Sequence, residues 1–214
     1  GGAAPSQGRL PPNIRRRLRS IFLSAELQSS VGAAKPGKER KGRAKPPLPK
    51  DVWLPDTELM VAREVDADPS GFFLGAKGGH NFESHNHNDV GSFVVYREGR
   101  PLVVDAGVGT YTAKTFSERR YEIWTMRSTY HTLLPSFDGV EQATGSQYRA
   151  RGVAREATES EARLELDIAP AYPSEAGVDE WRRVLTLRRG VGVELVDEYR
   201  LSRPPRRIVL ALLT

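Results

Sequence analysis

From Asp51 onward the chain is a succession of short apolar runs separated by turn residues, and this pattern restricts the fold more than any other feature. The runs are rich in β-branched and aromatic residues, which favour strands. The run WRRVLTLRR (181–189) alternates apolar and polar residues, as a half-buried antiparallel strand does. The nine runs cover residues 58–65, 71–78, 91–99, 100–107, 131–139, 162–169, 181–189, 191–201 and 207–214.

Two glycine-containing turns connect these runs. REGRP (97–101) is typical of a hairpin turn, and in RRGVG the residues Gly190 and Gly192 can adopt positive φ angles. The segment AKTFSERRYEIWT (113–125) is the one helix candidate after Asp51. We therefore predict an all-β fold, an antiparallel β-sandwich of stacked sheets, for a domain over residues 51–214.

The first fifty residues differ from the rest in charge. They contain 12 Lys and Arg against Glu26 and Glu39, a net charge of 12 − 2 = +10, whereas the remaining residues contain 20 basic and 25 acidic side chains, 20 − 25 = −5. We predict a basic, Pro/Gly-rich, disordered linker over residues 1–50 with a possible helix at 12–30, where apolar residues recur at helical spacing. Because the basic excess is confined to this segment, no nucleic-acid partner is expected.

Composition excludes some kinds of site. The chain has no cysteine, so a metal ion would have to be held by His, Asp or Glu. No run of about eighteen apolar residues occurs, and we expect no membrane span. The chain begins Gly-Gly and ends inside the apolar run RRIVLALLT, so we expect a piece of a longer protein.

The hexapeptide SHNHND (84–89) holds two of the four histidines, His85 and His87. In an extended segment both imidazoles, and Asp89 with them, would point to one side. Asp105 closes the apolar run PLVVDAG, and His131 opens the run HTLLPSF. Imidazole and carboxylate are ligands that a zinc-like ion accepts, so the combination indicates a metal site.

A blander interpretation of the same residues stays open. A single histidine is usually a surface residue or a hydrogen-bonded core residue, and an aspartate before Ala-Gly is often a turn former. In SERRYEIW, Arg120 could neutralise a substrate carboxylate and activate the phenol of Tyr121 for proton transfer. Equally, Tyr121 and Trp124 could form the apolar face of a short helix.

Three segments together resemble the heparinase II/III-like polysaccharide lyases, which include related alginate lyases. They are ESHNHNDVGSFVVYREGRPLVVDAGVGTYT (83–112), RRYEIW (119–124) and STYHTLLPSFDGVEQ (128–142). The shared order is H-x-H-x-D-x-G-S-F, a strand ending in D-x-G, a tyrosine, an R-Y pair, and a histidine followed by D-G. The similarity covers about residues 51–214 and is densest from 80 to 142.

The resemblance implies specific site residues. A metal, usually zinc and mainly structural here, would be held by His87, Asp105 and His131. Catalytic roles would fall on His85 and Tyr121, and substrate contacts on the two residues Asn86 and Arg120. One departure is Thr132, which stands where the family more often has Asn and could weaken the support of His131.

The resemblance also implies a partner domain and a reaction. Such lyases join an N-terminal α/α toroid, which carries the principal acid and base, to a C-terminal β domain. This chain would be that β domain, and the enzyme would cleave an acidic, uronic-acid-containing polysaccharide such as heparin, heparan sulfate or alginate. On this basis we expect the chain to be inactive alone, and the periplasm, the cell envelope or secretion as its location.

Two other functions stay open on the sequence. Without a toroid, the chain could be a non-catalytic, zinc-stabilised carbohydrate-binding module. H-x-H-x-D also begins the motif of metal-dependent hydrolases, although Val90 stands where that motif has a further histidine.

Overall fold

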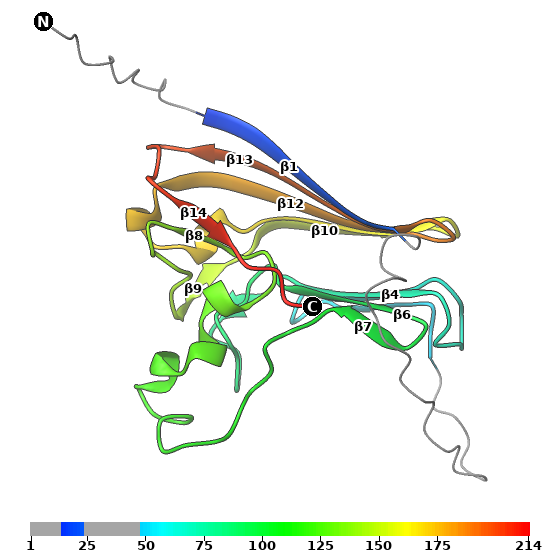
Figure 1. Ribbon diagram of the computed structural model, residues 1–214, viewed down its shortest axis with the longest axis horizontal. Coiled ribbons are helices and arrows are strands. Elements are labelled where there is room, and N and C mark those ends of the chain that lie inside the picture. The colour runs from blue at the N-terminus through cyan, green and yellow to red at the C-terminus, as the bar shows by residue number, and fades with distance from the viewer. Residues whose placement is uncertain (1–13, 24–47) are drawn as a thin grey trace, which may run out of the picture.

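Two antiparallel five-stranded sheets lie face to face and build the sandwich that the sequence predicts (Figure 1). The computed structural model describes residues 14–23 and 48–214. The large sheet has the order β1-β13-β12-β11-β10 and the small sheet the order β2-β3-β4-β6-β7. Strands of the large sheet are β1 (Ile14–Leu23), β10 (Arg151–Ala157), β11 (Glu161–Asp167), β12 (Val178–Arg188) and β13 (Gly192–Leu201). Those of the small sheet are β2 (Asp51–Leu54), β3 (Leu59–Arg63), β4 (Phe72–Lys77), β6 (Phe93–Arg97) and β7 (Arg100–Val103).

The two sheets diverge towards the left of Figure 1, where shorter elements fill the open end. Two small antiparallel pairs lie there, β14 with β8 and β5 with β9, beside short 3₁₀ helices. The short strands are β5 (His80–Asn81), β8 (Pro135–Phe137), β9 (Gly145–Arg149) and β14 (Ile208–Leu210). The 3₁₀ helices are η1 (Arg120–Glu122), η2 (Trp124–Met126), η3 (Ser128–Tyr130), η4 (Ala169–Ala171) and η5 (Ser174–Ala176).

The predicted helix over residues 113–125 is wrong. Turns occupy residues 113–119, and η1 and η2 follow as separate single turns, because Ile123 between them has an extended backbone with ψ 122°. Trp124 is 54% exposed, and Tyr121 bonds to a neighbouring loop, so no apolar face docks on the core to stabilise a longer helix. In the part of the chain that the structure describes, no helix could cross a membrane.

The possible helix at residues 12–30 is also wrong where the structure describes it. Residues 14–23 form β1, which pairs in register with the whole of β13, from Ile14 opposite Leu201 to Leu23 opposite Gly192. Without β1 the backbone groups along that edge of β13 would be unpaired, so strand pairing outweighs the local helical spacing. The rest of the predicted linker, residues 1–13 and 24–47, lies outside the described residues.

Both predicted turns are confirmed as hairpins. Glu98 and Gly99 have positive φ angles of 51° and 68° and join β6 to β7. Gly190 has a φ of 77° in the connection between β12 and β13. Alternate apolar residues of both sheets meet in one core, which includes Met60, Leu74, Phe93, Trp181 and Leu185.

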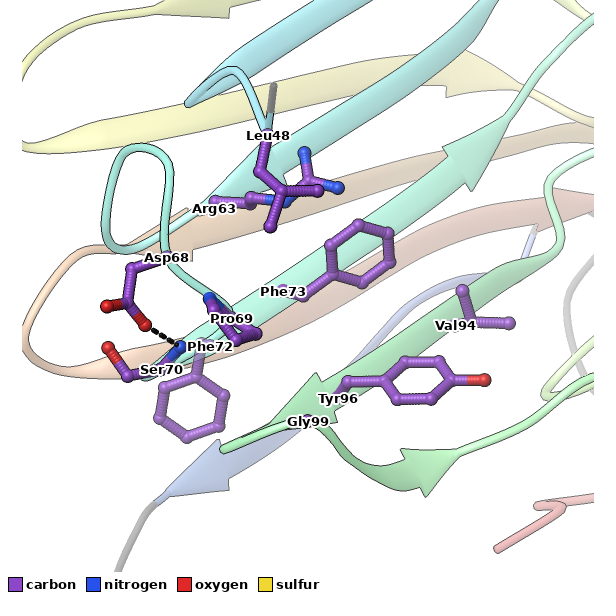
Figure 2. Close-up of a pocket in the computed structure, with 10 residues that line it drawn as sticks. All are labelled: Leu48, Arg63, Asp68, Pro69, Ser70, Phe72, Phe73, Val94, Tyr96 and Gly99. Atoms are coloured by element: carbon purple, nitrogen blue, oxygen red, sulfur yellow. Dashed lines mark hydrogen bonds between the residues drawn. The ribbon is translucent and has the colours of Figure 1, made fainter. Parts of the chain in front are cut away.

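The outer face of the small sheet carries a pocket of about 430 Å³ (Figure 2). Arg63, Phe73 and Tyr96 form one cross-strand row there. The Phe73 and Tyr96 rings meet edge to face at 5.8 Å, and the Arg63 guanidinium lies 5.0 Å from the centre of the Phe73 ring. Gly99 of the β6–β7 hairpin lines this pocket, so the pocket lies at the hairpin end of the small sheet. Asp105 follows the other end of β7 and therefore lies at the opposite end of the sheet from the pocket.

Arg183 of β12 connects the large sheet to the open end. Its side chain is fully buried and pairs with Asp197 of β13, whose side chain is only 2% exposed. Nε and Nη2 donate to the two carboxylate oxygens at 2.9 and 2.7 Å. Nη1 donates to the carbonyl of Gly91 at 2.8 Å and Nη2 to that of Leu133 at 2.6 Å. One side chain thus joins two adjacent strands to two loops.

We expect Arg183→Met to lower the free energy of unfolding by about 3–5 kcal/mol, because it leaves the buried Asp197 carboxylate without its partner. Urea unfolding measures this change. The matched control is Arg182→Met, since Arg182 is half-exposed and pairs with Glu165 and Glu198, and we expect a loss of less than about 1 kcal/mol. Arg183→Met combined with Asp197→Leu should recover part of the stability. Equal losses in the two single variants would contradict this role.

Candidate functional site

The three predicted metal ligands meet at the open end of the sandwich. His87 lies in the loop between β5 and β6, Asp105 follows β7, and His131 follows η3. One ligand atom from each residue lies within 4.8 Å of the other two. The two imidazole ring centres are 5.1 Å apart. Asp105 and His131 are 26 positions apart in sequence, and they are in direct contact: Asp105 Oδ2 lies 2.6 Å from His131 Nδ1.

The hydrogen bonds of His131 test whether this triad suits a cation. Its Nε2 lies 3.1 Å from the carbonyl oxygen of Thr125, which can only accept, so Nε2 carries a hydrogen. In a neutral ring Nδ1 then has a lone pair, and this lone pair faces the Asp105 carboxylate. A proton between the two atoms satisfies this contact. Two imidazoles and a carboxylate gathered at one place are nevertheless a donor set that can hold a metal ion.

The electrostatic environment favours the ligand forms of two of these groups. Burial lowers the pKa of His87 below its usual value, and the neighbouring His131 lowers it further. Burial raises the pKa of Asp105, but the hydrogen bond and charge of His131 outweigh this effect, so the pKa of that carboxyl lies below its usual range. A neutral imidazole and an ionised carboxylate are the states that bind metal.

The SHNHND segment is a loop rather than an extended strand. His85 has a φ of 58°, in the left-handed region that few residues other than glycine adopt. His85 is exposed, whereas His87 is only 9% exposed. Asp89 is held by Lys77, with Nζ 2.7 Å from Oδ1. The expectation that His85, His87 and Asp89 point to one side is therefore wrong, and H-x-H-x-D does not gather its side chains as a hydrolase motif would.

Asn86, Arg120 and Tyr121 form a second group beside the triad. The Tyr121 hydroxyl donates to Asn86 Oδ1 at 3.1 Å. Arg120 donates from Nε and Nη2 to the Asn86 carbonyl at 3.1 and 2.7 Å, and from Nη1 to the Thr115 carbonyl at 2.6 Å. Because Asn86 directly precedes His87, these bonds fix the loop that presents His87 to the triad. Much of the Arg120 hydrogen-bonding capacity thus goes to backbone carbonyls.

A pair of exposed aromatic side chains, Phe116 and Tyr111, lies beside His85. Its ring lies 5.1 Å from that of Phe116, which is 63% exposed and meets Tyr111 edge to face at 5.4 Å. The Arg120 guanidinium lies 6.0 Å from the centre of the Phe116 ring. Sequence reasoning missed Phe116, although an aromatic residue in the polar stretch AKTFSERR was a visible signal.

A buried network of amide side chains, which the sequence analysis did not identify, anchors the loop that carries His87. Asn81 donates to Gln142 Oε1 at 3.1 Å, and Gln142 in turn donates to the Val90 carbonyl at 2.8 Å. Asn88 donates to the Gln142 carbonyl at 3.3 Å. Asn81, Asn88 and Gln142 are each at most 4% exposed. Polar residues in a loop look like surface residues in sequence, so no local signal marks them.

Thr132 connects two of the ligand-bearing segments. Its hydroxyl donates to the carbonyl of Val104 at 2.9 Å, and Val104 precedes Asp105. The same hydroxyl accepts from the backbone N–H of Leu213 at 3.3 Å. The residue at which the sequence departs from the family pattern therefore links the backbones beside His131 and Asp105.

Two solved structures share this fold. Heparan sulfate lyase HepC from Pedobacter heparinus aligns with a TM-score of 0.52 and 19% identity over 70% of this chain. A structure of heparinase III aligns with a TM-score of 0.54 and 19% identity over 73%. This chain spans only 22% and 23% of those proteins. No curated protein sequence matches the chain significantly.

A family model resolves the relationship. The heparinase II/III-like C-terminal domain matches residues 47–211, which is most of the chain and includes every residue of the triad and of the Asn86 group. The stacked antiparallel sheets and the residue order around SHNHND agree with that match. On this basis the chain belongs to the heparinase II/III-like C-terminal domain family.

Proposed function

We propose that this chain is the β domain of a polysaccharide lyase that cleaves uronic-acid-containing polysaccharides such as heparan sulfate or alginate. One observation carries the proposal: a triad able to hold a metal lies beside the hydrogen-bonded pair Asn86 and Tyr121, with Asn86 directly before the triad residue His87, in a fold matched by the lyase family. The named activities of HepC and heparinase III support the same reaction class.

The reaction is a β-elimination. A base removes the proton at C5 of the uronate, the electron pair forms the C4–C5 double bond, and the glycosidic oxygen leaves C4 with a proton from an acid. Acidity at C5 requires that the carboxylate be neutralised by hydrogen bonds or a cation. The exposed His85 and the phenol of Tyr121 are our candidates for contacting the reacting sugar.

We assign Asn86 and Arg120 to substrate positioning. Asn86 Oδ1 accepts from the Tyr121 hydroxyl, so a sugar that contacts Asn86 is also placed near the phenol. Arg120 holds the Asn86 backbone in place and brings positive charge to the same loop. The exposed Phe116 ring beside His85 offers an apolar surface for the face of a sugar ring.

We assign a zinc ion to His87, Asp105 and His131. Two imidazoles and one carboxylate with a fourth position for water is a donor set that zinc accepts. We place the ion in a mainly structural role, because its three ligands come from three separate segments that it would tie together. We also propose a toroid domain in the same protein, which supplies the remaining acid–base groups and the opposite wall of the cleft.

Metal analysis tests the triad. We expect about one metal ion per purified chain by elemental mass spectrometry, lost in His87→Ala and in Asp105→Asn. The control is His80→Ala, because the His80 ring accepts from the backbone of Phe82 and stands outside the triad. Chelation should lower the melting temperature of the parent and leave that of His87→Ala unchanged. Metal retained by His87→Ala would reject the assignment.

Tyr121→Phe tests the lyase function in a protein that carries this chain together with its toroid. We expect turnover to fall by about 100-fold or more with substrate binding retained, because the proton-transferring hydroxyl is removed. Ultraviolet absorbance of the unsaturated product measures the rate. Tyr130→Phe is the control, since Tyr130 meets Trp124 edge to face and has no hydrogen bond to Asn86, and it should keep full activity. A parent that binds acidic oligosaccharides but never cleaves them would favour a carbohydrate-binding module.

A further inference from the structure

A polar groove of about 680 Å³ lies beside the β8–β14 pair, apart from the triad. Its walls come from the end of β8 and from the segment before β14. The lining residues are Ser136, Asp138, Gly139, Arg206, Arg207 and Val209.

A tight turn fixes one wall of this groove. Asp138 and Gly139 have positive φ angles of 52° and 87°, and Phe137 and Val140 exchange backbone hydrogen bonds across them at 3.0 and 2.9 Å. This is the geometry of a two-residue hairpin turn, for which Asp-Gly is a favoured sequence. The wall is therefore rigid and sets the direction of the Asp138 carboxylate.

The Asp138 carboxylate is occupied by backbone groups. Its two oxygens accept from the backbone N–H groups of Arg206 and Arg207 at 3.2 and 2.8 Å. The Asp138 N–H donates to the Arg207 carbonyl at 2.9 Å. These bonds fix the arginine backbone, and they leave both guanidinium groups without a hydrogen bond or ion pair to any described residue.

Two unpaired guanidinium groups in one groove suit an anion. Each presents a planar fork of donors that matches a carboxylate or a sulfate. Arg203, in the same segment, differs because its guanidinium bonds to the Glu175 carbonyl. Both groove arginines are exposed, so a ligand does not have to open the fold to reach them.

We propose that this groove binds an anionic group, carboxylate or sulfate, of an acidic oligosaccharide at a subsite separate from the triad. The identity of the saccharide rests on the proposed function, and the anionic character rests on the groove itself. His131 and Ser136 are five residues apart, so at most about 18 Å of chain separates the triad from the groove. One oligosaccharide of several units could contact both.

Titration of the full chain with three oligosaccharides tests the groove. The probes are a heparan sulfate hexasaccharide, an oligouronate without sulfate, and a neutral maltohexaose. At an ionic strength of about 0.15 M we expect Arg206→Ala combined with Arg207→Ala to weaken binding of an acidic probe by about tenfold. If the double variant binds only the sulfated probe more weakly, the groove is a sulfate site. If it binds both acidic probes more weakly, a carboxylate is enough for the groove to bind. The neutral probe should bind neither protein.

Arg155→Ala is the control for loss of a positive charge outside the groove. Arg155 is an exposed arginine of the large sheet with no ion pair among the described residues, so its removal changes net charge without touching the groove. It should leave the affinity unchanged, and the basic segment before Asp51 contributes equally in every variant. Arg206→Lys with Arg207→Lys should lose part of the affinity, because lysine keeps the charge but not the fork.

A second measurement uses the unmodified chain and therefore does not depend on correct folding of the double variant. In the unmodified chain, the backbone amide resonances of Gly139 and Arg207 should shift during titration with an acidic probe. The proposal is overturned if those resonances do not move, if the double variant binds as tightly as the parent, or if Arg155→Ala loses as much. It is separable from the lyase proposal when cleavage is measured in the protein that carries the toroid: binding that requires Arg206 and Arg207 without any cleavage there rejects only the lyase, and cleavage with unchanged binding in the double variant rejects only the groove.

Discussion

The buried guanidinium of Arg183 is the interaction on which the rest of the structure depends. Removal of a guanidinium and a carboxylate from water is unfavourable unless nearly every donor and acceptor is satisfied. Here the carboxylate of Asp197 and the carbonyls of Gly91 and Leu133 together receive four hydrogen bonds from it. Gly91 ends the loop that carries His87, and Leu133 lies two residues after His131. The large sheet therefore sets the position of two metal-ligand candidates that belong to other segments.

Around this anchor, the open end is stabilised by polar bonds to the backbone rather than by apolar packing. An irregular loop leaves backbone N–H and C=O groups that no strand partner satisfies. Asn81, Asn88 and Gln142 supply those partners beneath the loop, and Arg120 supplies them for Asn86. The result is a fixed loop that keeps the left-handed backbone of His85, a strained conformation of the kind found at binding sites.

The sequence predicts the regular parts of this fold better than the irregular ones. Strands with alternating residues, the two glycine-containing hairpins and a metal site in the histidine cluster were accessible from residue types and order. The choice of His87, Asp105 and His131 as its ligands came from the family resemblance. β1 was not, because the choice between helix and strand for residues 14–23 is made by the edge of β13, about 180 positions away. Arg183 left a partial signal: it is in phase with Trp181 and Leu185 on the core face of β12, where a charged residue requires a buried partner.

The exposed aromatic residues of this domain suit contact with a second surface. Tyr111, Phe116 and Trp124 are each more than half exposed, and all lie in the segment that leads from Asp105 to His131. A folded domain that functioned alone would gain little from leaving three aromatic side chains in water on one short segment. Contact with sugar rings or with a facing domain would remove that surface from water. Under the proposed function, His85 and Tyr121 would stand on one side of a cleft, and the Phe116 ring beside His85 would limit which sugars can lie against it.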